Sequence, residues 1–193
     1  MTKIIDATSV DEYAARIIAT YRRATPDQLC HGRQWYPVAR ELACLIGQGN
    51  VRTGAGVLAA LSSNTAWYLN VRYATELAAG KPVRTLRRNL DQARAILDGA
   101  DYADVLSGPK VLAFAANIAG DEDEVTVDRH AVRVALGEDY GGKMSGPAWR
   151  KRYEIIADAY RKAAAELGVS PATVQAVCWV VQREGTWEAR KEQ

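Results

Sequence analysis

The chain is 193 residues long and carries 25 basic against 23 acidic side chains, which gives a formal net charge of +2. This length suits one domain, or one domain with an appended lobe, and is enough to bury a substantial core. So small a net charge does not by itself point to nucleic acid, but the signs are unevenly distributed, which is compatible with a local basic face.

The cysteines and the hydropathy pattern exclude several classes of protein. Cys30, Cys44 and Cys178 lie far apart and form no CxxC pair, no zinc pattern and no iron–sulfur pattern. We therefore expect free thiols in a reducing compartment. The sequence has neither a secretory segment nor an apolar run of about 18 residues. It predicts a soluble, cytoplasmic protein with no membrane contact, no metal site, no iron–sulfur cluster and no other cofactor.

Helical periodicity and capping residues divide the chain into successive α-helices. A first helix is expected over 8–24, and Pro26 and Pro37 each open a further segment, the second of which closes at Gly47 and Gly49. The Gly-rich segment 137–152 is expected to be an exposed loop. No strand shows a convincing alternation, so the sequence predicts an all-α fold of about eight helices. The remaining helices are expected over 53–61 and 66–80, on either side of the polar break SSNT, and over 85–99, 111–120, 128–137, 152–168 and 170–193.

The segment 'VDRHAVRV', residues 127–134, resembles the VDxHxxRV motif of the helix–hairpin–helix DNA glycosylases, the endonuclease III-like (HhH-GPD) superfamily. The Asp of that motif is the essential catalytic carboxylate of the family. The resemblance therefore implies that Asp128 is catalytic, with His130 and Arg133 as the neighbouring motif residues that contact DNA.

A second match lies upstream, where 'LSGPKVLA' occupies the place of the family's glycine-rich hairpin, LPGxGxKTA. Bifunctional members carry a nucleophilic Lys at the end of this hairpin, eighteen positions before the Asp, and Lys110 has that spacing from Asp128. Gly108 is the hairpin glycine that the resemblance assigns to DNA binding. The segment lacks the second glycine, and Pro109 removes one backbone N–H donor.

Two further pieces follow the family's order, so that the resemblance covers about residues 50–137. 'VLAALSSN' is similar to the helix-ending LLSxQ, and Asn64 stands where the family's Gln enters the gap left in the duplex. 'NLDQARAIL' resembles the NxxKAxxI helix before the hairpin. Trp67, just after Asn64, is expected to stack on a base or to brace the turn.

The implied chemistry is cleavage of an N-glycosidic bond, which builds positive charge on the sugar. A fixed carboxylate such as Asp128 stabilises that charge and orients or deprotonates the nucleophile. An amine nucleophile, Lys110, would instead form a Schiff base. The base must leave the stack, and phosphates would be neutralised by basic side chains: Arg87, Arg88, Arg150, Lys151 and Arg152.

Each assignment also has a purely structural interpretation. Asp128 is a good helix N-cap, Lys110 an ordinary surface lysine, and Asn64 a common turn residue. His130 is interpreted first as a structural hydrogen-bond partner. The aromatic residues at helical spacing are more typical of a core than of a base-stacking surface: Trp67, Tyr68, Tyr73 and Trp179.

The leading hypothesis is a DNA glycosylase that excises a modified or mismatched base from duplex or single-stranded DNA. Its core would span about 50–137, and the helices of 8–49 and 150–193 would pack as a second lobe, with Asp128 at the mouth of a cleft. One alternative is a catalytically inactive glycosylase-like scaffold that binds DNA or protein. Another is an enzyme acting on a free modified nucleotide or a hypermodified phage base.

Overall fold

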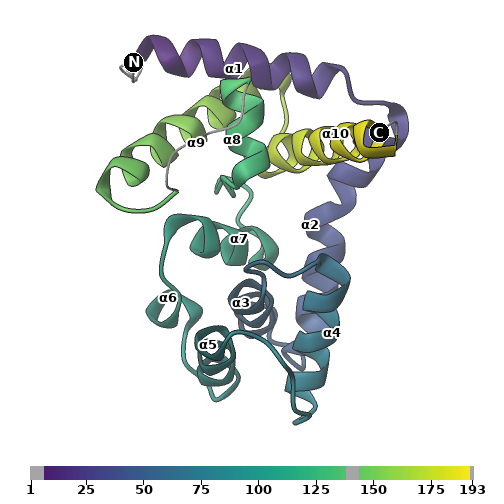
Figure 1. The fold of residues 1–193 in the computed structure, drawn as a ribbon, viewed down its shortest axis with the longest axis vertical. Helices are drawn as coiled ribbons and strands as arrows, with labels where there is room; N and C mark the ends of the chain where they lie inside the picture. The colour runs from purple at the N-terminus through teal and green to yellow at the C-terminus, as the bar shows by residue number, and fades with distance from the viewer. Residues whose placement is uncertain (1–6, 138–143, 192–193) are drawn as a thin grey trace. The chain divides into compact units, whose positions relative to one another are not determined.

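The computed structural model describes residues 7–137 and 144–191, and within these ranges it contains ten α-helices and no strand (Figure 1). The predicted all-α class is confirmed. The helices are α1 (Ala7–Arg22), α2 (Pro26–Ile46), α3 (Val51–Leu61), α4 (Trp67–Ala78), α5 (Arg87–Leu97), α6 (Tyr102–Val105), α7 (Pro109–Ala119), α8 (Arg129–Leu136), α9 (Pro147–Leu167) and α10 (Pro171–Lys191).

Two predicted boundaries are wrong. Pro37 does not open a separate segment but lies inside the single helix α2, where its missing N–H removes one main-chain hydrogen bond. The expected loop over 137–152 falls partly on 138–143, outside the described residues, and its last part is the first turns of α9. Pro147 occupies the first helical position there and Trp149 is buried at 4% exposure, because it packs edge-on against Tyr153 one turn later.

The chain divides into two compact units. Unit 1 comprises Met1–Trp35 and Glu122–Gln193, and unit 2 comprises the continuous segment Tyr36–Asp121. The first boundary falls inside α2, so the N-terminal part of that helix belongs to unit 1 and the remainder to unit 2.

Unit 1 is built around α1, which packs on α9, α8 and α10. The apolar faces of these helices meet in one continuous core whose largest members are fully buried, among them Ile17, Ile156 and Tyr160. The start of α2 joins this core at Gly32, where an added Cβ would lie 2.6 Å from the Cα of Val177 on α10. Helices from both ends of the sequence therefore form the same core.

Unit 2 is built around α3, whose residues 54–61 are all buried. Figure 1 shows α3 in the midst of α4, α5, α6 and α7, and each of these four helices contacts it. The N-terminus of α3 is capped by the Asn50 side chain, which accepts from the backbone N–H of Thr53 at 3.1 Å. Arg52 then pairs with both carboxylate oxygens of Asp101 at 2.6 and 2.8 Å, which ties the start of α6 to α3.

In the described residues no single helix is both long and apolar enough to cross a membrane. The pair α9 and α10 reaches the required length and hydropathy only together, and it is bent by 101° at the break between the helices. Many of the apolar residues of this pair belong to the core of unit 1.

Replacement of Gly54 by Ala should destabilise the protein. An added Cβ would lie 1.9 Å from the carbonyl oxygen of Ala43, because α3 approaches the backbone of α2 closely at this point. Overpacking of this kind typically costs about 1–3 kcal/mol, whereas helix propensity alone favours Ala over Gly by about 1 kcal/mol. Urea unfolding measures the sign of the change. Thr75→Ala on the exposed side of α4 is the control, and a Gly54→Ala protein as stable as the wild type would contradict the close approach.

Candidate functional site

The segment that leads into α8 is held by a buried tyrosine of α9. Val125 and Val127 are completely buried. The hydroxyl of Tyr153 donates to the carbonyl oxygen of Val125 at 2.7 Å and accepts from the backbone N–H of Val127 at 3.2 Å. Burial raises the pKa of Tyr153, so the hydroxyl remains a donor at physiological pH. This one group therefore fixes the chain up to the residue before Asp128.

Asp128 is the N-cap of α8, which confirms its structural interpretation. Its Oδ1 accepts hydrogen bonds from the backbone N–H groups of His130 and Ala131, both at 2.9 Å. Within the described part of the chain, no hydrogen bond reaches its other carboxylate oxygen, Oδ2. The side chain is partly buried, and the dipole of α8 favours a negative charge at this end. One oxygen of Asp128 is thus held by the backbone of α8, and the other accepts no hydrogen bond from the described residues.

The far end of α8 is also fixed from within unit 1. Arg16 of α1 donates to the carbonyl oxygens of Ala135 and Leu136 at 3.2 and 2.8 Å. Gly137 follows in the left-handed conformation, with φ of 76°, and closes the helix. Because both ends of α8 are bonded to other groups, the helix is a rigid support for Asp128 and for the two motif residues behind it.

His130 is half-buried next to Asp128. Its ring lies edge-on to Trp179, with 6.3 Å between centroids, and the Nε of Arg129 lies 3.5 Å from its Nε2. Burial lowers the pKa of His130; the charge of Asp128 opposes this effect, and Arg129, Arg183 and Arg133 add to it. The imidazole is therefore neutral at physiological pH.

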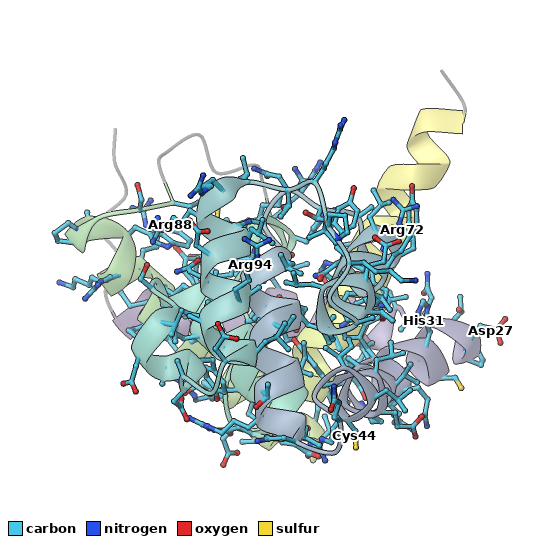
Figure 2. All side chains as sticks on the ribbon, turned by 90° about the horizontal axis from the view of Figure 1, so that it is seen from below. Asp27, His31, Cys44, Arg72, Arg88 and Arg94 are labelled. Carbon is cyan, nitrogen blue, oxygen red and sulfur yellow. The ribbon has the colours of Figure 1, made fainter. Side chains whose placement is uncertain are left out.

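One loop of unit 2 brings together two residues expected to contact DNA, Gly108 and Arg88, and the expected nucleophile, Lys110. Gly108, with φ of 98°, is the N-cap of α7, and Pro109 is its first helical residue. Gly108 has no side chain to cap this helix end, and no other described side chain is hydrogen-bonded to it. Lys110 follows in the first turn and is partly buried. Arg88, labelled in Figure 2, reaches the same loop from α5 and donates to the hydroxyl of Ser107 at 2.7 Å.

The turn between α3 and α4 carries the expected wedge residue. Asn64 is exposed and has a φ of 57°, the left-handed conformation that Asn tolerates well. Its role as a turn residue is confirmed, and its role as a wedge stays a prediction. Trp67 begins α4 and packs edge-on against Phe114 of α7, with 6.4 Å between centroids, so it braces this turn.

Two other side chains of this region, for which the sequence predicted roles, are exposed. Tyr68 is 72% exposed, so its assignment to the core is wrong. The buried face of α4 is formed by Asn70, Ala74 and Leu77, and Tyr68 points away from it. Arg87 is also exposed, and its Nε pairs with Asp91 one turn later at 3.3 Å.

The sequence-predicted residues are divided between the two units. Unit 1 holds Asp128, His130 and Arg133 and also the basic residues 150–152 of α9, and unit 2 holds the others: Asn64, Trp67, Arg87, Arg88, Gly108 and Lys110. Sequence reasoning missed Tyr153 and interpreted Trp179 as core, although Trp179 is only partly buried. The hydrogen-bonding role of Tyr153 has no local sequence signal, since its partners lie 26 and 28 positions away.

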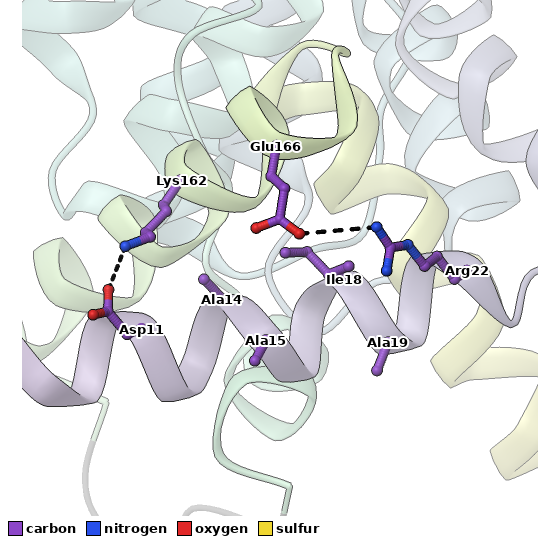
Figure 3. Close-up of a pocket in the computed structure, with 8 residues that line it drawn as sticks. All are labelled: Asp11, Ala14, Ala15, Ile18, Ala19, Arg22, Lys162 and Glu166. Carbon is purple, nitrogen blue, oxygen red and sulfur yellow. Dashed lines mark hydrogen bonds and ion pairs between the residues drawn. The ribbon is translucent and has the colours of Figure 1, made fainter.

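A separate hollow of about 250 Å³ lies between α1 and α9 (Figure 3). Ion pairs span it at both ends: Lys162 with Asp11, and Arg22 with Glu166 at 3.8 Å. Its floor is formed by small and aliphatic side chains of α1. It includes none of the residues that the motif singles out, and its charges are already paired.

The described residues contain no cluster of His, Cys, Asp and Glu side chains suited to a metal ion. The fold defines an all-α protein of two units with a helix-capping carboxylate in the first. Residues 1–186 match a family described as "Family of unknown function (DUF7178)", and the chain belongs to that family. Neither a curated protein nor a solved structure matches the chain.

Replacement of Tyr153 by Phe should lower the free energy of unfolding by about 1–3 kcal/mol, because it leaves a buried N–H and a buried carbonyl without a partner. Chemical denaturation with urea measures this loss. Tyr160→Phe is the matched control, since the Tyr160 hydroxyl makes one longer bond, 3.4 Å to the carbonyl of Ala131. Equal losses in the two variants would contradict the special role of Tyr153.

The stability of the protein should fall as the pH drops below about 6.5, and His130 should account for part of this fall. Its pKa is lowered in the folded state, so the unfolded chain binds the proton more readily, and stability is lost from the unfolded pKa downward. Urea midpoints at pH 7.5 and 5.5 measure the effect, and His130→Gln should reduce the difference. His31, the other histidine of the chain, is exposed, and His31→Gln is the control. A His130→Gln protein with the wild-type pH dependence would contradict this origin.

Proposed function

We propose that this protein is a DNA glycosylase-like enzyme that cleaves the N-glycosidic bond of a modified or mismatched nucleotide, with Asp128 as the catalytic carboxylate. The observation that carries the proposal is that the two oxygens of the Asp128 carboxylate differ in their hydrogen bonds. Oδ1 is fixed by two backbone N–H groups of α8, and Oδ2 has no hydrogen bond from the described residues. A carboxylate held in this way is preorganised at no further cost when positive charge develops beside it.

Asp128 would act by holding a negative charge at a fixed position beside the sugar. As the bond between the base and the sugar lengthens, positive charge grows on the anomeric carbon, and a fixed carboxylate oxygen stabilises it. The same oxygen can accept a proton from the attacking water, whose hydroxyl bonds to the anomeric carbon. The base leaves with the bonding electrons and takes up a proton from solvent, and Asp128 returns its proton to solvent, so that one water is consumed. The neutral His130 beside it adds no competing positive charge.

Most of the contacts with DNA would be made by residues of unit 2. The α7 N-terminus offers first-turn N–H groups without a side-chain cap, beside Lys110 and the guanidinium of Arg88. Helix N-termini and basic side chains are suited to phosphate. Asn64 projects from an exposed turn and would fill the space that a flipped base leaves. Lys110 is the candidate Schiff-base nucleophile.

The test is base release from duplex and single-stranded oligonucleotides that carry damaged or modified bases. The wild type should create alkali-sensitive sites, and Asp128→Asn should lose at least 100-fold in rate, because the neutral amide cannot stabilise the cation. Asn caps helices about as well as Asp, so the fold of this variant should be preserved. Asp101→Asn is the matched control, since Asp101 is also an N-cap, bonded to the backbone N–H of Ala103 at 2.8 Å, and should retain activity.

Borohydride trapping of the protein on the oligonucleotide, lost in Lys110→Ala, would assign the Schiff base. If the wild type releases no base from any probe, or if Asp128→Asn is as active as the wild type, the catalytic proposal fails. Binding of DNA without base release would then favour the inactive scaffold, for which Asp128 is a cap alone.

A further inference from the structure

Four aromatic rings of unit 1 form a continuous row that begins on α2 and ends at the start of α8. Its members are His31 and Trp35 of α2, Trp179 of α10 and His130 of α8. The ring centroids are separated by 5.9 Å, 4.7 Å and 6.3 Å in that order. We call this set the aromatic row.

The aromatic row reaches the surface. His31 is exposed, as Figure 2 shows where it projects from α2, and both tryptophans are only partly buried. This differs from the other tryptophan–tyrosine contact of unit 1, in which Trp149 and Tyr153 are 4% and 3% exposed. A row that served only to fill the core would be closed to solvent as that pair is. The aromatic row thus has an exposed ring at one end, His31, and three partly exposed rings after it.

Three arginines lie at the aromatic row or act electrostatically on it. The guanidinium of Arg183 lies over the ring of Trp179, 4.9 Å from its centroid. Arg129 lies next to His130, and Arg133 is close enough to act electrostatically on the same ring. Among the described residues, Asp128 is the acidic group that acts electrostatically on His130, and its Oδ1 is engaged by α8. Asp27 is exposed one turn before His31.

We propose that the aromatic row is a binding surface for single-stranded nucleic acid, on which unpaired bases stack while the arginines neutralise phosphates. Aromatic faces interleaved with guanidinium groups suit a single strand because every base has a π-face. Duplex bases are stacked on one another and cannot reach such rings, so the row favours unpaired substrate. This inference deepens the proposed function, on which it rests for the identity of the ligand, because the row ends beside Asp128.

The experiment is fluorescence anisotropy of a labelled single-stranded oligonucleotide and of the duplex of the same sequence, at several salt concentrations. The wild type should bind the single strand more tightly. Trp179→Leu should weaken that binding about 5- to 100-fold, the range for loss of one base–aromatic stack. Arg183→Gln and His31→Ala alter exposed side chains and should leave the fold intact. Arg183→Gln should also reduce the slope of the logarithm of the binding constant against the logarithm of the salt concentration by about one, because one phosphate contact is lost.

Tyr68→Ala removes an exposed aromatic ring of unit 2, and Arg22→Gln removes an exposed charge of α1, so both serve as controls and should bind as the wild type does. The inference is overturned if the wild type binds duplex as tightly as single strand, or if Arg183→Gln and His31→Ala both bind normally. Single-strand binding that depends on the row, without base release from any probe, would remove the proposed function and keep this inference. Base release by the wild type that none of the row variants changes would support the proposed function and overturn this inference.

Discussion

The hydroxyl of Tyr153 is the group on which the candidate site depends most. It closes the hydrogen bonds of a buried, extended segment that has no strand partner, and it does so from a different helix. Without it, the carbonyl of Val125 and the N–H of Val127 would lose these hydrogen bonds, and buried unpaired backbone groups are rare in native proteins. A second tyrosine of α9, Tyr160, contacts α8 in a similar way through the carbonyl of Ala131. Helix α9 thus positions both the segment that leads to Asp128 and the helix that Asp128 begins.

The structural and the chemical interpretations of Asp128 are compatible, because a carboxylate has two oxygens. The N-cap uses Oδ1 and leaves Oδ2 without a hydrogen bond from the described residues. A serine or threonine cap would offer a single oxygen and no charge. An aspartate at this position therefore has a second oxygen and a negative charge that the helix cap does not require, and a catalytic role would use both.

Much of the fold could be predicted from local signals. The caps at Asp128 and Gly120, and the turn at Asn64, follow from residue type and spacing. The errors occur where the structure departs from the usual preference of a residue type. Pro37 is tolerated inside α2 although proline is typical of a helix start, and Trp149 is drawn into the core by Tyr153 although its neighbours are charged. The aromatic row was beyond prediction, because its members come from three helices and meet only after unit 1 has folded.

The division of the chain has a consequence for how the protein is made. Unit 2 is one continuous segment, so its helices can associate as soon as Asp121 has left the ribosome. Unit 1 is interrupted by the whole of unit 2, and α1 finds its main partner, α9, only after that segment has been synthesised. Until then the apolar face of α1, with Tyr13, Ile17 and Tyr21, has no native cover. The residues around Asp128 are consequently among the last to acquire their native environment.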